Sequence, residues 1–282
     1  MRLAIASGKG GTGKTTLATC LAKAAARVGC SVAYLDCDVE EPNGHLLLQP
    51  EIVRWQTINK LLPVVDAQLC TFCGRCSQAC RFRAIACLAK QVLIFAELCH
   101  SCGGCVLACP NNALREVPVS IGELRFGFAG SIQFVEGRLK VSEAMSPPAI
   151  RAVKGSDVSA ELRIYDCPPG TSCPVVESVR GCDLVLLVTE PTPFGLYDLT
   201  LAVKMVQSLK LPAAVVLNRC DIGDDRVARY CESRNIPILA ELAEDRRVAE
   251  AYARGRLAYD EVPDFADGVH SLLEHILKDK NR

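Results

Sequence analysis

The stretch Gly8-Lys9-Gly10-Gly11-Thr12-Gly13-Lys14-Thr15 decides the fold of this chain of 282 residues. It matches the phosphate-binding pattern G-x-x-x-x-G-K-[ST] at every fixed position. Apolar residues 2–6 before it predict a buried strand, and residues 16–27 after it predict an amphipathic helix that ends at Gly29. A strand, a glycine loop and a helix in this order present backbone N–H groups and the positive end of a helix dipole to phosphate. The stretch therefore predicts a nucleotide-binding site.

The residues of this loop have separate expected roles. The glycines let the backbone approach the phosphate oxygens, because they carry no side chain. Lys14 is expected to reach the β- and γ-phosphates, and the Thr15 hydroxyl to ligate Mg²⁺. We expect the nucleotide to be held by Gly10, Gly11, Thr12, Gly13, Lys14, Thr15 and Thr16.

Two further apolar strands end in acidic residues. Residues 31–38 end with Asp36 and Asp38, and residues 162–166 end with Asp166. The carboxyl ends of parallel strands lie beside a phosphate loop, where Mg²⁺ and an attacking water bind. The pattern therefore predicts Asp36 and Asp166 near the Mg²⁺ ion. Each could also be a plain carboxylate at a strand end.

The 17 cysteines are the most unusual feature of the composition. Eight of them form two runs of the pattern C-x2-C-x2-C-x3-C, which together make an internal repeat. The first run is Cys70, Cys73, Cys76 and Cys80, and the second is Cys99, Cys102, Cys105 and Cys109. Without a signal peptide, metal or cluster ligation is favoured over disulfides. A zinc ribbon would need only four ligands in two pairs, which makes zinc a poor match.

Charge and hydropathy exclude several classes of protein. Lys plus Arg equals Asp plus Glu, at 32 each, so no basic excess suggests binding to nucleic acid. No apolar run approaches the ~18–20 residues that span a bilayer. We therefore expect a soluble, cytoplasmic protein. The C-terminal helix has one apolar face, from Phe265 to Leu277, which could bind a membrane. Its acidic residues favour packing on the sheet, so we expect no membrane contact.

The remaining segments alternate between strands and helices. Strands are expected at 183–190, 213–218 and 236–240, with helices at 198–209 and 246–254. Such alternation, with ligands at the strand ends, predicts an α/β fold with a doubly wound, mostly parallel sheet. The cysteine runs interrupt this pattern. We expect three segments: 1–62 and 119–282 form the sheet domain, and 63–118 form an inserted module.

Because Lys9 is present, the loop also fits the form K-G-G-x-G-K-[ST], and here the sequence resembles the deviant Walker A ATPases of the MinD, ParA and nitrogenase iron protein type. The resemblance implies ATP hydrolysis in a nucleotide-enclosing dimer, with Lys9 reaching the partner's nucleotide. It implies that Asp38 activates the water and that Asp166 holds Mg²⁺ as the Walker B residue. Pro168-Pro169-Gly170 would be the second switch. The plainer alternative for Lys9 is a solvated loop lysine.

Other expected site residues follow only from this resemblance. Asn218 matches the strand-end asparagine that reads the adenine edge, and Pro237 is expected to line the base pocket. Cys173 follows Asp166 by seven residues, the offset of a subunit-bridging cluster ligand in the nitrogenase iron protein. Such a cluster needs a second thiolate from each chain, and Cys167 and Cys182 are the candidates. The alternative for Cys173 is a small buried side chain.

Residues 63–118 resemble the bacterial two-cluster ferredoxin. The resemblance implies two [4Fe–4S] clusters, each held by three cysteines of one run and the fourth of the other. The two sets would be Cys70, Cys73, Cys76 and Cys109, and Cys99, Cys102, Cys105 and Cys80. One departure is visible, because the proline that follows the fourth cysteine is present as Pro110 but replaced by Arg81 in the first run. Cys87 lies outside the pattern and is expected to be a packing residue.

Taken together, the chain resembles MinD-superfamily ATPases with an inserted ferredoxin domain, relatives of the Mrp-type cluster carriers. This implies ATP or ADP, Mg²⁺ and two [4Fe–4S] clusters as cofactors, with a labile bridging cluster as a possible third. The implied function is carriage or assembly of iron–sulfur clusters. The alternatives are an ATP-gated electron donor and a MinD-like positioning ATPase, which needs no cysteines. Expected partners are a second copy or a paralogous ATPase, and an apo iron–sulfur or redox protein.

Overall fold

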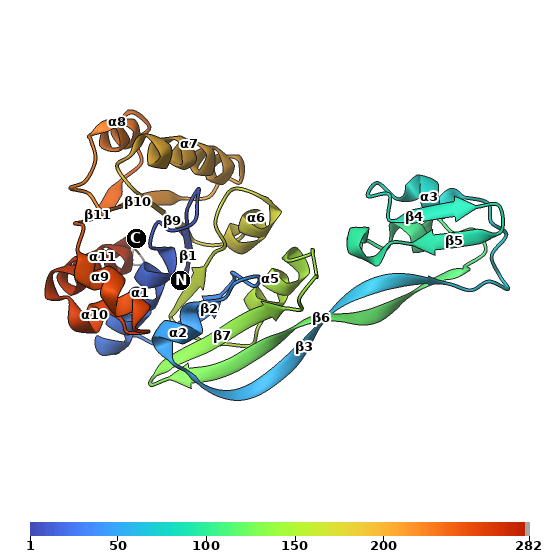
Figure 1. Cartoon of the computed structure of the whole chain (residues 1–282), viewed down its shortest axis with the longest axis horizontal. Coiled ribbons are helices and arrows are strands. Elements are labelled where there is room, and N and C mark those ends of the chain that lie inside the picture. The colour runs from blue at the N-terminus through green and yellow to red at the C-terminus, as the bar shows by residue number, and fades with distance from the viewer. Residues whose placement is uncertain (280–282) are drawn as a thin grey trace. The chain divides into compact units, whose positions relative to one another are not determined.

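The chain divides into two compact units in a computed structural model that describes residues 1–279 (Figure 1). The first unit comprises residues 1–56, 124–138 and the chain from Ile150 onward. The second comprises residues 57–123 and 139–149. The expected insert, 63–118, lies inside the second unit. The chain passes between the units at four points, of which two lie in the long strands β3 (Glu51–Val65) and β6 (Leu114–Ala129).

The first unit is built on a mostly parallel sheet. The strand order is β11-β10-β9-β1-β8-β2-β7-β6-β3, and neighbours from β11 to β7 pair in parallel. The parallel strands are β1 (Arg2–Ala6), β2 (Val32–Asp36), β7 (Ile132–Leu139), β8 (Leu162–Asp166), β9 (Leu184–Thr189), β10 (Ala213–Asn218) and β11 (Ile238–Leu242). This order confirms the predicted doubly wound α/β fold, because helical crossovers connect most of the parallel strands.

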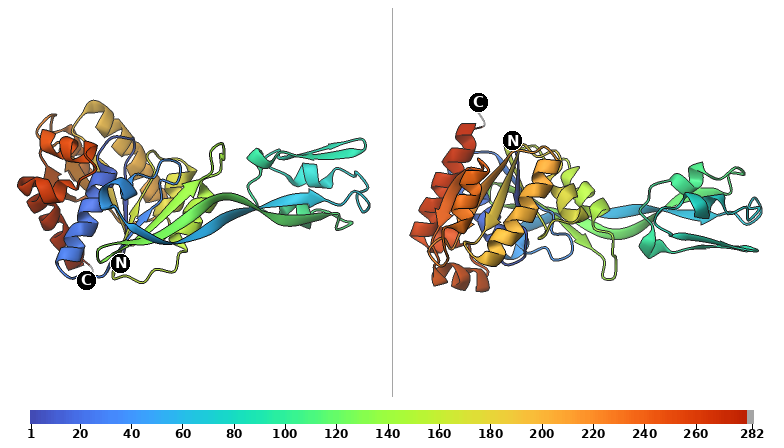
Figure 2. Two further views of the ribbon diagram at one scale, coloured as in Figure 1. Left: turned by 60° about the horizontal axis from the view of Figure 1, so that its bottom comes forward. Right: turned by 90° about the horizontal axis from the view of Figure 1, so that it is seen from above.

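Helices cover both faces of this sheet (Figure 2). They are α1 (Lys14–Arg27), α2 (Gly44–Leu48), α5 (Pro147–Lys154), α6 (Cys173–Val179), α7 (Pro193–Ser208), α8 (Arg226–Ser233), α9 (Arg246–Ala253), α10 (Ala258–Glu261) and α11 (Pro263–Asp279). None of the helices within residues 1–279 is long and apolar enough to cross a membrane.

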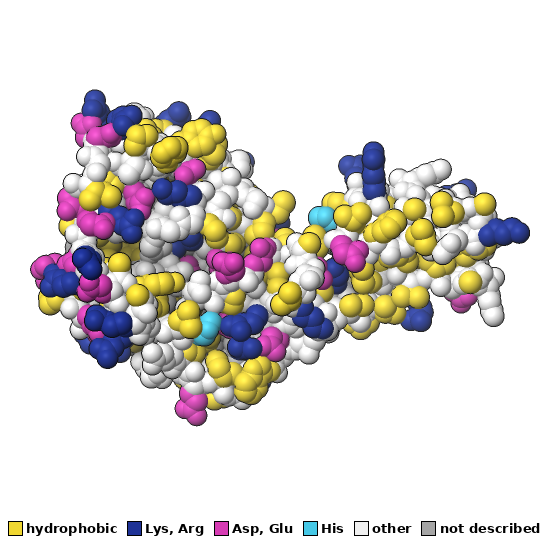
Figure 3. Space-filling view, in the orientation of Figure 1, with side chains coloured by type: hydrophobic (Ala, Val, Ile, Leu, Met, Phe, Trp, Pro, Cys, Tyr) yellow, Lys and Arg dark blue, Asp and Glu magenta, His cyan; other side chains and the backbone are white. Residues whose placement is uncertain are grey.

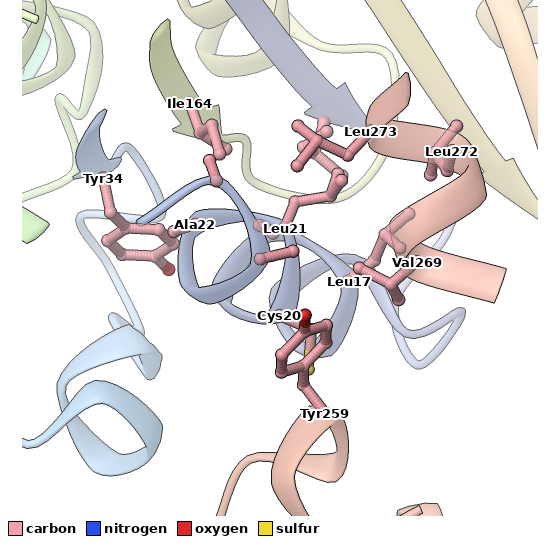
Figure 4. Packing of buried hydrophobic residues seen from close by; sticks show 14 of the residues in the cluster. Leu17, Cys20, Leu21, Ala22, Tyr34, Ile164, Tyr259, Val269, Leu272 and Leu273 are labelled. Carbon is pink, nitrogen blue, oxygen red and sulfur yellow. The ribbon is translucent and has the colours of Figure 1, made fainter. Parts of the chain in front are cut away.

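Helix α1 lies at the centre of the main core. Its residues Leu17 and Leu21 are buried against the sheet and against Val269, Leu272 and Leu273 of α11 (Figure 4). The apolar face of α11 is thus part of the core, as the packing alternative predicted. The C-terminal residues that follow this helix, 280–282, lie outside the described residues.

Three segments differ from the sequence-based expectations. Strand β3 was not expected, because its sequence does not show a clean alternation of apolar and polar residues. Helix α2 begins at Gly44, in a segment where no helix was predicted. Helix α7 begins at Pro193 rather than near 198, because Thr192 caps it by accepting a hydrogen bond from Gly195 N at 3.0 Å.

The second unit is small and repetitive. It contains α3 (Arg75–Ala79), the antiparallel pair β4 (Ile85–Leu88) and β5 (Gln91–Ile94), a short 3-10 turn η1 (Ala96–Leu98) and α4 (Gly104–Leu107). Left-handed backbone conformations recur at positions that the cysteine repeat pairs with each other: Phe72 and Ser101, Gly74 and Gly103, and Arg83 and Asn112. The sequence repeat is therefore also a repeat of backbone geometry.

Candidate functional site

The phosphate loop joins β1 to α1 and borders the main cavity of the first unit. Gly11 and Gly13 have φ values of 77° and 92°, a conformation that a side chain disfavours. The cavity has a volume of about 430 Å³. Of the predicted residues, it is lined by Gly10, Gly11, Gly13, Lys14, Thr15, Thr16, Asp38 and Asn218. The structure therefore brings most of the predicted nucleotide site together.

Thr12 has a different environment from the rest of the loop. It is buried, and its carbonyl accepts a hydrogen bond of 2.9 Å from Asn218 Nδ2. Asn218 thus braces the loop with one amide hydrogen. Its other hydrogen and its carbonyl oxygen remain for the expected contact with the base, which stays a prediction.

Two buried carboxylates lie next to each other behind the loop. Asp36 and Asp166 occupy paired positions on β2 and β8, and Tyr34 Oη donates to Asp166 Oδ2 at 2.7 Å. Burial raises the pKa of Asp166, and burial together with the Asp166 charge raises the pKa of Asp36 well above its usual range. Asp166 Oδ1 has no hydrogen-bond partner among the residues that the structure describes. A buried carboxylate oxygen without a partner fits a hydrated Mg²⁺ ion.

The Thr15 hydroxyl lies close enough to Asp166 to lower the pKa of that carboxyl. A P-loop Mg²⁺ site uses a hydroxyl and a carboxylate of this kind, and the Mg²⁺ site stays a prediction. Asp36 has another task as well. Its Oδ1 accepts from Asp38 N at 3.1 Å, and its Oδ2 accepts from Gly44 N at 3.0 Å. The Asp36 side chain therefore holds the backbone of the following loop.

Asp38 lies on the wall of the cavity and is half-buried. Burial, followed by the charge of Asp166, raises its pKa to about 6, and Lys14 opposes this shift. A carboxylate with this pKa can accept a proton near neutral pH, which is what activation of a water requires.

Lys9 is bound within its own chain. Its Nζ lies 3.2 Å from Glu190 Oε2, at the end of β9. Arg219 Nη1 also contacts Glu190 at 2.8 Å, and Arg219 Nε contacts Glu244 at 2.9 Å. Lys9 is therefore neither a free solvated lysine nor, in this single chain, extended toward a second molecule.

Pro237 does not line the cavity, and the prediction of a base contact there is wrong. It precedes β11, whereas the nucleotide cavity lies at the carboxyl ends of the strands. Leu242, Ala243, Glu244 and Asp245, at and beyond the carboxyl end of β11, line it instead.

The sequence reasoning missed the aromatic residues of this cavity. Tyr252 of α9 and Phe265 of α11 both line it. Burial and then the charges of Asp166 and Asp36 raise the pKa of Tyr252, so its hydroxyl is within electrostatic reach of the phosphate end. No motif marks these positions, because helix packing alone brings them to the site.

The cysteines of the second unit gather around two small cavities. One is lined by Cys70, Cys73, Cys76, Cys87 and Cys109. The other is lined by Cys80, Cys99, Cys102 and Cys105. Each cavity thus collects three cysteines of one run and the fourth cysteine of the other run. This is the grouping that the ferredoxin resemblance implies.

Backbone N–H groups point at several of these sulfurs. Ala84 N donates to Cys80 Sγ, and Ala113 N donates to Cys109 Sγ, both at 3.2 Å. The N–H of Arg75 lowers the pKa of Cys73. Such donors stabilise thiolates and cluster sulfurs. The two N–H to sulfur hydrogen bonds have equal lengths and occupy equivalent positions of the repeat. The repeat therefore includes the hydrogen-bond donors of the two cavities as well as their cysteines.

No three His, Cys, Asp or Glu side chains within residues 1–279 converge closely enough to hold a single metal ion. In a [4Fe–4S] cube each thiolate binds a different iron, so its four sulfurs lie further apart than the ligands of one ion. The donor set fits a cube, with the four implied ligands around each cavity and N–H donors to the sulfurs.

The three cysteines expected near a bridging cluster have unequal exposure. Cys173 is exposed at the start of α6, but Cys167 and Cys182 are buried. Burial raises the pKa of Cys182 to about 11 and that of Cys167 well above the usual range. Cys173 is therefore not a buried packing residue. Neither candidate for the second thiolate is accessible to a partner chain.

The loop, the buried carboxylates and the parallel sheet define a P-loop nucleotide-binding protein. The family described as the CobQ/CobB/MinD/ParA nucleotide binding domain matches residues 3–258, and the chain belongs to this family. The chain is accordingly a P-loop ATPase of the MinD/ParA type.

Three individual comparisons support this placement. An uncharacterized protein of Methanocaldococcus jannaschii is 35% identical over 227 residues, which cover 78% of each chain. The iron-sulfur cluster carrier protein of Pyrococcus abyssi is 23% identical over 269 residues, covering 89% of this chain and 76% of that protein. The septum site-determining protein MinD of Pyrococcus horikoshii, solved with Mg-ADP, has a TM-score of 0.61 at 19% identity, over 98% of this chain and 95% of that one. The last likeness shows the fold alone.

Proposed function

We propose that this protein is an ATP-dependent carrier of [4Fe–4S] clusters. The observation that carries the proposal is the sorting of the eight cysteines of the repeat into two sets of four around two cavities, on a chain that also has a complete phosphate loop. The distant similarity to an iron-sulfur cluster carrier protein agrees with it. A positioning ATPase of the MinD type would share the fold but would leave the cysteine cavities without a role.

The residues of the first unit would divide the work of hydrolysis. When bound, MgATP supplies the phosphoanhydride bond that is broken. Lys14 and the N–H groups of the loop hold the phosphates, and Thr15 and Asp166 hold the ion. Asp38 orients the attacking water and accepts its proton. Lys9 would leave Glu190 and contact the nucleotide of a second chain, which makes a nucleotide-dependent dimer part of the proposal.

The second unit would bind the clusters and meet the partner protein. Its cysteine thiolates hold the irons, and its N–H groups stabilise the sulfurs. Several large apolar side chains on this unit are exposed: Leu69, Phe82, Leu88, Leu98 and Leu107. Figure 3 shows apolar side chains in yellow over this part of the molecule. Exposed apolar surface of this kind suits contact with another protein. An apo iron–sulfur protein is the partner we propose.

The test begins with anaerobically purified protein and a count of iron and acid-labile sulfide. Two cubes give about eight irons per chain. The loaded protein is then mixed with an apo-ferredoxin, with MgATP, with MgADP and without nucleotide. We expect MgATP to change the rate of cluster transfer at least several-fold, and Lys14→Ala to remove that change. Less than about one iron per chain would exclude a cluster-binding role.

An ATP-gated electron donor is the second candidate. Two adjacent clusters in one unit favour it, since two-cluster ferredoxins transfer electrons. Under this candidate MgATP would shift the reduction potential of the clusters and leave their transfer to an apo-acceptor unchanged. The same preparation therefore distinguishes the two candidates.

A further inference from the structure

The first cysteine cavity contains one thiol more than a cube requires. Cys87 of β4 lines it together with Cys70, Cys73, Cys76 and Cys109. Its Sγ donates to the carbonyl of Phe72 at 3.4 Å, and Phe72 directly precedes Cys73. Cys87 thus lies beside the loop that carries the proposed ligands.

The second cavity has a carboxylate at the equivalent place. Glu116 occupies the position that the repeat pairs with Cys87, and it lines the second cavity. Its two carboxylate oxygens lie 3.8 Å from where a Cβ atom on Gly103 would be, directly after Cys102. The two cavities therefore match at their four proposed ligands and differ in the fifth group beside the ligand loop.

We infer that Cys87 is a reserve ligand of the first cluster site: when one of the four ligands is missing, Cys87 can bind the iron that this ligand would have held. The second site has no such reserve ligand. The inference rests on the proposed cluster-binding function. It follows from the position of the Cys87 thiol beside the Phe72–Cys73 segment and from the preference of iron in such clusters for sulfur ligands. Thiolates are the preferred ligands of iron–sulfur clusters, whereas carboxylates prefer harder ions.

The exchange involves no oxidation or reduction. If Cys73 is absent, the Cys87 thiol releases its proton to water, and its thiolate forms the iron–sulfur bond that Cys73 would have made. The bond from Cys87 to the Phe72 carbonyl is a weak S–H contact, so breaking it requires little energy. Cys73 is exposed, so solvent can accept the proton.

The repeat supplies a matched pair of variants. Cys73→Ala and Cys102→Ala remove equivalent ligands from the two sites. Each protein is reconstituted anaerobically, and iron and labile sulfide are counted. We expect Cys73→Ala to keep about eight irons, as two intact cubes require, and Cys102→Ala to lose between one and four. The double variant Cys73→Ala/Cys87→Ala should lose iron as Cys102→Ala does, while Cys87→Ala alone should keep about eight.

A second experiment adds a thiol to the second site and leaves the first site unchanged. In Cys102→Ala/Glu116→Cys, the new thiol takes the place that Cys87 has in the first site, and the lost irons should return. Equal iron loss in Cys73→Ala and Cys102→Ala, with no return in Cys102→Ala/Glu116→Cys, would overturn the inference and leave the proposed function intact. Wild-type protein without iron would instead overturn the proposed function itself.

Discussion

At the scale of single residues, Asp38 connects the electrostatics of the cavity to its chemistry. Burial and the nearby Asp166 raise its pKa to about 6. A raised carboxyl pKa favours the protonated form, and a protonated Asp38 cannot accept a proton from water. We therefore expect the rate of phosphate release to fall as the pH decreases through about 6, and to be constant above about 7.

The matched variant is Asp38→Asn, which keeps the shape of the side chain and cannot act as a base. We expect kcat to fall by roughly 10²–10⁴, with little change in nucleotide affinity. Phosphate release and binding of a fluorescent nucleotide measure the two quantities separately. A variant that hydrolyses ATP at the wild-type rate would remove Asp38 from the mechanism.

Glu190 is the second residue whose role can be tested alone. It holds Lys9 at 3.2 Å, and that contact must break before Lys9 can reach another chain. Glu190→Gln should favour the dimer formed with a non-hydrolysable ATP analogue by up to about 1 kcal/mol, or about five-fold in its dissociation constant. Analytical ultracentrifugation over a range of protein concentrations measures this constant.

The control for this experiment is Glu261→Gln. Glu261 pairs with Arg254 and Arg256 and not with Lys9, and it does not line the nucleotide cavity, so the same loss of charge should leave the dimer nearly unchanged. An equal effect of both substitutions would indicate a general effect of charge. A weaker dimer in Glu190→Gln would show that the glutamate supports association.

At the scale of elements, α11 is as much a part of the nucleotide domain as the sheet. Leu273 is buried within the main core, where α11 packs against α1 and β11. Leu273→Ala should reduce the free energy of unfolding by roughly 2–5 kcal/mol, because it leaves a cavity in a packed core. Ser271→Ala, at an exposed position of the same helix, should change it by less than about 0.5 kcal/mol. Urea denaturation of the nucleotide-free protein provides both values.

The same elements show how much of the site the sequence could predict. Lys14 and Thr15 belong to a motif of fixed spacing, and so local sequence was enough to place them in the cavity. Tyr252 and Phe265 reach it only because α11 packs against β11 and α9 packs against α10, and no spacing rule records those contacts. Pro237 was misplaced for a related reason: it stands near the right strand but precedes it, and only the direction of the strand decides which end faces the nucleotide.

At the scale of the whole molecule, the two units differ in what holds them together. The first has a large apolar core, whereas the second contains two small buried clusters, one of Cys76, Ile85, Cys105 and Leu114 and one of Leu62, Ala84 and Cys99. Cysteines that we propose as cluster ligands are thus also core residues. We therefore expect the proposed iron–sulfur clusters to contribute to the stability of the second unit.

Removal of the clusters should therefore unfold one unit and spare the other. After anaerobic treatment with a chelator and an oxidant, we expect limited proteolysis to cut first within residues 57–123 and to leave fragments of the first unit resistant. Nucleotide affinity should stay within about two-fold, because the residues of that cavity all belong to the first unit. Loss of nucleotide binding together with the clusters would show that the first unit needs the second to fold.

The two hydrogen bonds accepted by Asp36 have a mechanical consequence. The Asp36 carboxylate accepts from the backbone N–H of Asp38 and from that of Gly44 at the same time. The segment between these two residues is therefore a loop whose two ends are held by one side chain. Gly44 cannot be replaced without moving its neighbour, since a Cβ there would lie 2.2 Å from the Tyr34 hydroxyl. This loop can move as a whole, but its two ends cannot separate while both hydrogen bonds are intact. The Asp36 carboxylate therefore limits how far Asp38 can move toward the phosphates, and any such movement must turn about Asp36.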